Sequence, residues 1–490
     1  MDRLDVAALT GTLCSAEFDE TVVCEHRDPP TGPVAGAPSH GRPLYRRRVV
    51  GTFSQAARLV ALARQLPRIP RRQRLHRTRL LAHFARSFLV RAPSIPDAAG
   101  GLTAMNDIPI LLIYAPSLQS SDGTTVQLRR LLAEFPTPVW HIHGYSPPAF
   151  ADLPGNCASL PILLEPRYPF RKGAGFVRRA WRRWWVPRFV CSRLAQATRV
   201  HRAPPPQVAY VVVYDELHAV FARAVLGAAG VDRYVLHMMD LFHARFDARA
   251  QPNLAKLIAG ASGVFAVSSR LADEIAPAAR QPVEVLPLVT GFVRPSATSS
   301  VRTAPYLMMS GALYAGDPHR LDFLRNALLP AWLELVKEIP GIEWLYSGAD
   351  AGSLPPPLRA VIKNCGLLDQ ATWCATLAGA RCTVFPIIHH DGDHYRYSVP
   401  SRLVDSLAAG VPVIAPSCPN TATGDFLDAF SNRGVIVATT PEEVQVQLKR
   451  LFCDDDFHRR QVIAALSAAE GFSLKPTQRQ LFEAIQRVEA

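Results

Sequence analysis

The segment Cys382–Pro416 constrains the fold more than any other part of the sequence, because it contains a complete strand, loop, helix and second strand. Its two apolar runs, CTVFPII and VPVIA, are typical of buried strands in a parallel sheet. Between them, Ser398 is predicted to cap a helix that has Pro400 in its first turn and Gly410 at its end. Such a helix begins at the carboxyl edge of the sheet, where its free N–H groups attract anions. The segment therefore predicts an α/β protein with a phosphate-facing site.

Strand and helix patterns alternate along most of the chain, which predicts parallel sheets with helices on both faces. A chain of 490 residues exceeds the size of a single core, so more than one domain is expected. A linker at Val293–Pro305 divides the pattern into a first domain over 105–295 and a second over 296–470. We expect two Rossmann-like domains that face each other across a cleft, with a last helix within 471–490 that packs back on the first domain. The predicted strands are 108–115, 139–144, 208–214, 233–239, 263–269, 283–288, 306–311, 342–348, 382–388, 411–415 and 433–438.

Two further expectations concern the second domain and the nucleotide motifs. A helical segment is predicted over 358–364, and two helices are predicted after Pro441. The sequence contains neither GxGxxG nor GxxxxGK[ST], which argues against a dinucleotide dehydrogenase and a P-loop kinase.

Residues 1–104 form a basic extension rather than a third domain. Fourteen arginines lie between Arg42 and Arg91, and no Asp or Glu lies between Pro29 and Pro96, so the stretch from Pro29 to Pro96 alone can account for the net charge of +13. Three interpretations stay open: a disordered tail, a basic amphipathic arm, or residues upstream of a native start at Met105. N-terminal sequencing that finds residues before Met105 in the native protein would exclude the third.

A second basic segment, Phe170–Arg202, interleaves tryptophans with arginines, and no acidic residue occurs from Pro166 to Tyr214. This composition suits peripheral contact with an anionic membrane, and the alternative is a basic helix packed on its own domain. A nucleic-acid partner is not expected, because no nucleic-acid-binding motif accompanies the charge. Nine scattered cysteines, the absence of a secretory signal pattern and the lack of a long apolar run indicate a cytoplasmic location, with the inner face of the membrane as the alternative.

The run YSVPSRLVDSLAAGVPVIA resembles the donor-binding signature of GT-B glycosyltransferases, especially the GT4-like group, whose usual form is EGFPLxLLEAMAxGxPV. GVFAVSSRLADEI and LMMSGAL resemble two other parts of that family, and the resemblance covers roughly residues 106–470. It implies a GT-B fold, a nucleotide-diphosphate sugar as substrate and no cofactor.

The resemblance also implies roles for residues near the donor. The second Glu of the signature falls on Asp405, which would accept hydrogen bonds from the nucleotide ribose. Ser401 lies one helical turn earlier on the same face. The first Glu falls on Tyr397, and a phenol does not replace a carboxylate beside a sugar, so this departure puts sugar recognition and activity in question.

The leaving nucleoside diphosphate develops negative charge that the protein has to neutralise. The helix N-terminus from Ser398 to Arg402 supplies N–H groups, and Arg402 and Arg320 supply cations. Gly311 follows the first strand of the donor domain and Gly123 lies in a loop of the first domain. Both glycines are expected to permit close approach to the donor.

On the acceptor side, the segment LHMMDLFHARFD follows a predicted strand and resembles the His-containing acceptor loop of the family. His237 is the first candidate for orienting or deprotonating the acceptor hydroxyl, with Asp240 as the second candidate and His243 as another. Each could equally be a structural residue.

The loop HHDGDH carries Asp391 and Asp393 in a DxD arrangement, together with His389, His390 and His394. Oxygen ligands of this kind suit Mg²⁺ or Mn²⁺. Acids that flank a glycine are also common in turns, so a polar loop near the sugar is preferred and no metal is expected.

These observations predict a glycosyltransferase of the hexosyltransferase type, which uses a nucleotide-sugar donor and a glycan or lipid-linked acceptor, as in envelope polysaccharide synthesis. Two alternatives stay open. One is a sugar-nucleotide epimerase of the same fold, and the other is a non-catalytic nucleotide-sugar-binding or scaffold protein with a degenerate site.

Overall fold

A computed structural model describes residues 108–119, 123–144, 152–162, 186–241, 245–295, 304–311, 313, 321–348, 352, 354–386 and 396–489. All of them belong to one compact unit, Ala92–Ala490. The predicted extension over 1–104 lies outside the described residues.

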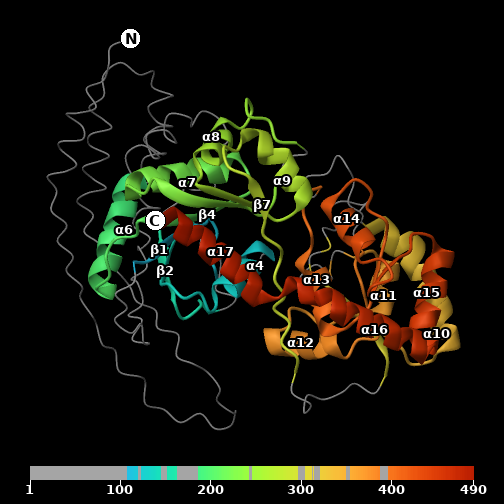
Figure 1. Cartoon of the computed structure of the whole chain (residues 1–490). Helices are drawn as coiled ribbons and strands as arrows, with labels where there is room; N and C mark the ends of the chain where they lie inside the picture. The colour runs from blue at the N-terminus through green and yellow to red at the C-terminus, as the bar shows by residue number, and fades with distance from the viewer. Residues whose placement is uncertain are drawn as a thin grey trace, which may run out of the picture. The chain divides into compact units, whose positions relative to one another are not determined.

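The first sheet contains seven parallel strands in the order β3-β2-β1-β4-β5-β6-β7 (Figure 1). Its central strands are continuous apolar runs, because a parallel sheet is covered on both faces. Register is set by pairs such as Leu112↔His141 and Val212↔His237. The strands are β1 (Ile110–Ile113), β2 (Val139–His143), β3 (Cys157–Pro161), β4 (Val208–Val213), β5 (Arg233–Met238), β6 (Gly263–Ala266) and β7 (Val283–Val285).

Among the described residues, five helices of the first domain connect these strands. Helix α7 has Asp215 as its N-cap and Gly230 in the left-handed conformation at its C-cap, as its sequence favours. The five helices are α4 (Gly123–Leu132), α6 (Val186–His201), α7 (Glu216–Ala229), α8 (Pro252–Gly260) and α9 (Ser269–Ile275).

The second sheet contains six parallel strands in the order β10-β9-β8-β11-β12-β13. One face of it carries a core built around Trp332, Trp344 and Tyr346. The strands are β8 (Tyr306–Ser310), β9 (Glu343–Ser347), β10 (Ile362–Asn364), β11 (Cys382–Val384), β12 (Val413–Ala415) and β13 (Val435–Val437). The helices are α10 (Leu329–Glu338), α11 (Pro356–Val361), α12 (Gln370–Ala378), α13 (Ser401–Ala409), α14 (Ala422–Ala429), α15 (Pro441–Cys453), α16 (Asp455–Ala469) and α17 (Leu474–Glu489).

The last helix, α17, follows the second sheet in sequence but packs against β4, β5 and α4 of the first (Figure 1). Phe482 of α17 meets Phe135 edge to face, with ring centroids 5.6 Å apart. Gln478 donates a hydrogen bond to the carbonyl oxygen of Leu131 at 2.8 Å. The chain thus crosses back, so that residues from both ends of 108–489 build the first core.

The structure differs from the predicted elements at four places. Residues 362–364 form the edge strand β10 rather than helix, because Ile362 pairs with Trp344. Strand β3 was not predicted, since CASLP has no β-branched residue and ends in proline, which an edge strand tolerates. Three helices rather than two follow residue 440, and α14 was not predicted.

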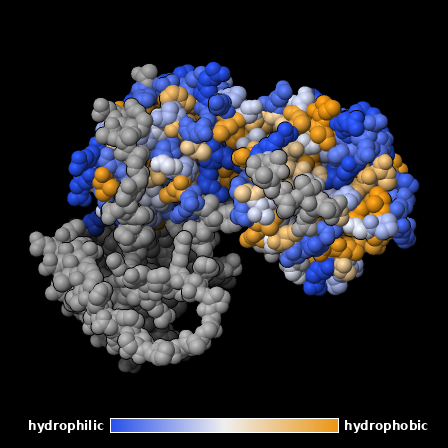
Figure 2. Space-filling model, turned by 90° about the horizontal axis from the view of Figure 1, so that it is seen from below, coloured by the Kyte–Doolittle hydropathy of each residue, from blue (hydrophilic) through white to orange (hydrophobic). Residues whose placement is uncertain are grey.

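None of the described helices is both long and apolar enough to cross a membrane. In the view of Figure 2, hydrophobic and hydrophilic residues are interspersed over the described surface. Within the basic segment Phe170–Arg202, only residues 186–202 are described. Helix α6 exposes Arg188 and Arg199 and contains no acid, whereas the tryptophan-rich part lies outside the described residues.

Candidate functional site

Each sheet has a point at which the strand order reverses, and ligands of open α/β sheets bind outside the carboxyl ends of the strands at that point. In the first sheet the reversal lies between β1 and β4, and in the second it lies between β8 and β11. Gly311 directly follows β8, and α13 follows β11 in the chain. Gly311 and the predicted donor residues of α13 therefore belong to the reversal point of the second sheet.

The structure brings Gly311 and Arg402 together. The Arg402 guanidinium donates a hydrogen bond to the carbonyl oxygen of Ser310 and lies 5.4 Å from the centroid of the Phe385 ring. Gly311 has a φ of +87°, and a Cβ at this position would lie 3.1 Å from Arg402 Nη1. The backbone conformation thus favours glycine, and a Cβ here would also contact the arginine tightly.

Helix α13 begins later than its sequence indicates. Its N-cap is Pro400, which supplies no side-chain hydrogen bond, so Ser398 is not the cap. The Ser398 hydroxyl is buried and has no hydrogen-bond partner, while its backbone oxygen accepts a hydrogen bond from Thr423 at 2.8 Å. Ser401 is the first helical residue and is half-buried. Pro400 contributes no capping side chain, and the Leu403 N–H bonds to the Pro400 carbonyl oxygen at 3.0 Å. The N-terminus of a helix carries a partial positive charge that favours an anion.

Asp405 is buried and already used inside the protein. Its Oδ2 accepts a hydrogen bond from Arg130 Nη2 of α4 at 3.0 Å. Its Oδ1 accepts from the Thr290 hydroxyl at 3.1 Å and from the Gly291 backbone N–H at 3.0 Å. The Arg130 and Asp405 side chains retain only 12% and 4% of their exposure. A ribose contact at Asp405 therefore requires Arg130, Thr290 or Gly291 to withdraw.

The same contacts join the two domains through the segment that follows β7 and precedes the linker. Arg130 also donates to the carbonyl oxygen of Val289 at 3.3 Å. Its guanidinium lies directly on Gly291, where a Cβ would be 1.9 Å from Arg130 Nε. We call the group Arg130, Val289, Thr290, Gly291 and Asp405 the interdomain latch.

Tyr397 is buried and points to the first domain. Burial raises the pKa of its phenol, and a hydrogen bond to the carboxylate of Glu274 raises it further, so the phenol stays protonated. The backbone oxygen of Tyr397 accepts a hydrogen bond from the Ser268 hydroxyl at 2.8 Å. Glu274 also accepts from the backbone N–H of Phe246 at 2.7 Å. The position of the first signature Glu thus holds a phenol bonded to a carboxylate of the other domain.

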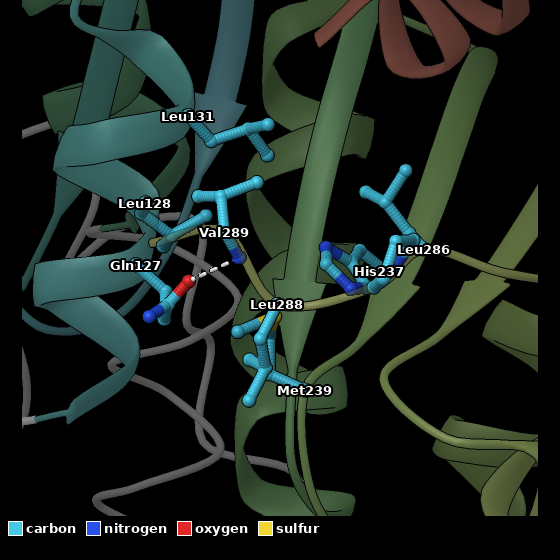
Figure 3. A pocket seen from close by; sticks show the side chains of 9 residues that line it. Gln127, Leu128, Leu131, His237, Met239, Leu286, Leu288 and Val289 are labelled. Atoms are coloured by element: carbon cyan, nitrogen blue, oxygen red, sulfur yellow. Dashed lines mark hydrogen bonds between the residues drawn. The ribbon is translucent and has the colours of Figure 1, made fainter. Parts of the chain in front are cut away.

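His237 lies in a small cavity beneath α4 and the segment after β7 (Figure 3). Its Nδ1 is 2.6 Å from the Tyr210 hydroxyl, and its Nε2 is buried without a hydrogen-bond partner. Burial lowers the pKa of His237 to about 3, so the imidazole is neutral at physiological pH. The cavity, of about 10 Å³, has room for about one water molecule. This geometry favours a structural role, because an acceptor sugar cannot reach the ring.

The buried imidazole makes stability depend on pH. Below about pH 6.5 the unfolded chain binds a proton at His237 that the folded chain does not bind until about pH 3. The free energy of unfolding should therefore fall as pH decreases from about 6.5, by up to about 1.4 kcal/mol per pH unit from this residue. Urea unfolding at pH 7, 6 and 5 should show a steeper decrease for wild type than for His237→Gln. Equal slopes would contradict this assignment.

The other predicted residues have the following positions. Asp240 follows β5, is half-buried and accepts a hydrogen bond from the backbone N–H of Leu241 at 2.8 Å. Gly123 begins α4, and a Cβ there would meet nothing within 4 Å. Arg320, His243 and the HHDGDH loop lie outside the described residues. Within the described ranges, no group of three His, Cys, Asp or Glu side chains could hold a metal ion.

Two features were missed from the sequence. One is the interdomain latch. The other is a polar cluster at the reversal point of the first sheet, in which Tyr114, Tyr214 and Thr125 share hydroxyl contacts and His218 is bonded to Asp215. Tyr114 directly follows β1, and Tyr214 and Asp215 are the first two residues after β4. This position at the carboxyl end of a strand is the signal that could have identified them from the sequence.

Solved structures share this architecture. HepE from Anabaena, in complex with UDP and glucose, is 12% identical with a TM-score of 0.52, over 77% of this chain and 99% of that chain. The chain has the GT-B fold. A glycosyltransferase from Rickettsia africae is 12% identical with a TM-score of 0.55, over 78% of this chain and 99% of that one. The trehalose-6-phosphate synthase OtsA is 10% identical with a TM-score of 0.55, over 78% of this chain and 99% of that chain.

At the level of sequence, no family model matches the chain and no curated protein matches it. The GT-B assignment thus rests on architecture, and it agrees with the fold predicted from the donor-binding signature.

Proposed function

We propose that the protein is a glycosyltransferase of the hexosyltransferase type, which moves a sugar from a nucleoside diphosphate to a hydroxyl of a glycan or lipid-linked acceptor. The observation that carries this proposal is the arrangement of Arg402, Gly311 and the N-terminus of α13 at the reversal point of the second sheet. A fixed cation beside a helix N-terminus suits a diphosphate, and it does so best when the negative charge of the diphosphate grows as it leaves.

In the proposed reaction, the acceptor oxygen forms a bond to the anomeric carbon while the bond from that carbon to the diphosphate oxygen breaks. The electron pair of the broken bond stays on the diphosphate, where Arg402 and the N-terminus of α13 stabilise it. The acceptor proton leaves to a base. No metal is required for this neutralisation, because the cation and the helix end supply it.

We propose that Asp405 accepts hydrogen bonds from the ribose hydroxyls once Arg130 releases it. Three contacts hold the carboxylate in the present state, and a carboxylate offers about four acceptor positions. Donor binding at Asp405 would then compete with the interdomain latch.

A binding protein without transferase activity is the second candidate, and the observation that favours it is Tyr397. Its phenol is bonded to Glu274, so this position offers no free carboxylate to a sugar. Under this alternative the protein would bind a nucleoside diphosphate and transfer nothing.

The test uses calorimetric binding and product analysis with a panel of nucleoside diphosphate sugars. Wild type should bind at least one donor and release the nucleoside diphosphate when an acceptor is present. Asp405→Ala should weaken donor binding tenfold or more, at roughly 1.5–3 kcal/mol per hydrogen bond to a charged group. Arg130→Ala is the matched control, because it breaks the same latch and keeps the carboxylate.

Each outcome separates the candidates. Binding without transfer supports the binding protein, and conversion of the donor sugar without an acceptor supports an epimerase. Equal losses of affinity in Asp405→Ala and Arg130→Ala would mean that the latch, not a ribose contact, is what the donor site needs.

A further inference from the structure

The reversal point of the first sheet holds an ordered hydroxyl network. The Tyr114 hydroxyl, just after β1, lies 2.5 Å from the Tyr214 hydroxyl, just after β4. It also lies 3.1 Å from the Thr125 hydroxyl in the first turn of α4. Both tyrosines are almost fully buried. The network therefore fixes the carboxyl ends of β1 and β4 relative to each other, at the place where an α/β sheet receives a ligand.

A histidine and an aspartate stand at the rim of this network. His218 Nδ1 lies 2.7 Å from Asp215 Oδ1, and the same oxygen accepts the His218 backbone N–H at 2.9 Å. The Tyr214 ring meets the His218 ring edge to face at 4.8 Å. The imidazole is thus held from two sides, with Nδ1–H toward the carboxylate and the lone pair on Nε2.

The pair keeps contact with solvent, unlike His237. The His218 and Asp215 side chains retain 17% and 20% of their exposure. Burial tends to raise the pKa of Asp215, but hydrogen bonds from the His218 side chain and backbone outweigh it, so the pKa lies below its usual value. The carboxylate is therefore ionised near neutral pH and can stabilise a protonated imidazole.

Building on the proposed transferase function, we infer that His218 is the base that accepts the proton of the acceptor hydroxyl. As the acceptor oxygen bonds to the anomeric carbon, its proton passes to His218 Nε2, and the diphosphate leaves with the electron pair of the broken bond. Asp215 is a positioning residue that fixes the tautomer and stabilises the imidazolium. His237, sealed beneath α4, takes no part in the proton transfer.

A purely structural role would leave a different signature. Asp215 caps α7 through the His218 backbone N–H, and that bond does not need the imidazole. Asparagine caps helices about as well as aspartate. Asp215→Asn therefore keeps the cap while it removes the charge beside the imidazole.

The experiment compares wild type, His218→Gln, His218→Ala and Asp215→Asn, with donor affinity and the kcat of transfer measured separately. His218→Gln should lower kcat about 10²–10⁴-fold and leave the donor Kd within about twofold. Added imidazole should restore part of the activity of His218→Ala. Asp215→Asn should lower kcat less and leave the urea midpoint unchanged.

The inference would be overturned if His218→Gln transferred sugar at the wild-type rate, or if its lower kcat were accompanied by an equal loss of donor affinity. Either result would leave the proposed transferase function intact. Failure of imidazole to rescue His218→Ala would also count against the inference. Donor binding by wild type with no transfer to any acceptor would instead overturn the proposed function, and this inference with it.

Discussion

Arg130→Ala is expected to lower the free energy of unfolding by about 3–5 kcal/mol, because it leaves the Asp405 carboxylate buried without its cation. The loss would appear in urea unfolding followed by tryptophan fluorescence. Donor binding should be maintained or tightened, because the carboxylate of Asp405 is freed for the ribose. Lower stability together with intact donor binding would show that Arg130 stabilises the fold and does not itself bind the donor.

Two variants make the expectation specific to the interdomain latch. Lys337→Ala removes an ion pair whose side chains are more than half exposed, and it should cost less than about 1 kcal/mol. Gly291→Ala leaves both charges in place but puts a Cβ where the Arg130 side chain lies, so it should reproduce most of the loss. If Arg130→Ala cost no more than Lys337→Ala, the latch would not contribute to stability.

The latch could not have been predicted from the sequence, because Arg130 and Asp405 are 275 positions apart. Each has an ordinary local explanation, a basic residue in the last turn of α4 and a carboxylate on α13. Only the course of the segment after β7, which places Thr290 and Gly291 beside both residues, shows that the two charges meet.

The sheets, in contrast, were predicted from local runs. Strands β1 and β4 are continuous apolar segments, and such runs indicate strands that are buried on both faces of the sheet. The pattern failed where tertiary contacts decide the structure, as at β3 and β10, which are held by pairing at the sheet edges. It also misplaced the start of α13, since both Ser398 and Ser401 are acceptable near a helix start.

His237 shows why position along a strand is a weak guide to chemistry. The residue lies near the carboxyl end of β5, as predicted, but its side chain points beneath α4, where Gln127, Leu128 and Leu131 cover it (Figure 3). Sequence gives the alternation of faces but not which helix covers each face. His218 carries no strand pattern at all, and only its distance to Asp215 draws attention to it.

Arg402→Ala is expected to lower the kcat of transfer about 10²–10³-fold, the usual cost of removing one fixed group that stabilises developing charge. The donor Kd should change less than kcat, because the charge of the diphosphate is greatest as it leaves. Rapid-quench or coupled assays at saturating donor, together with calorimetric titration, separate the two effects.

Arg433→Ala is the matched control for the lost aromatic contact, since Arg433 lies 5.7 Å from the centroid of the Phe430 ring, close to the 5.4 Å of Arg402 and Phe385. It should leave both kcat and Kd unchanged. Arg402→Lys keeps the charge but not the planar guanidinium between Phe385 and Ser310, so an intermediate kcat is expected. A kcat for Arg402→Ala equal to that of Arg433→Ala would mean that α13 neutralises the leaving group through its N–H groups alone.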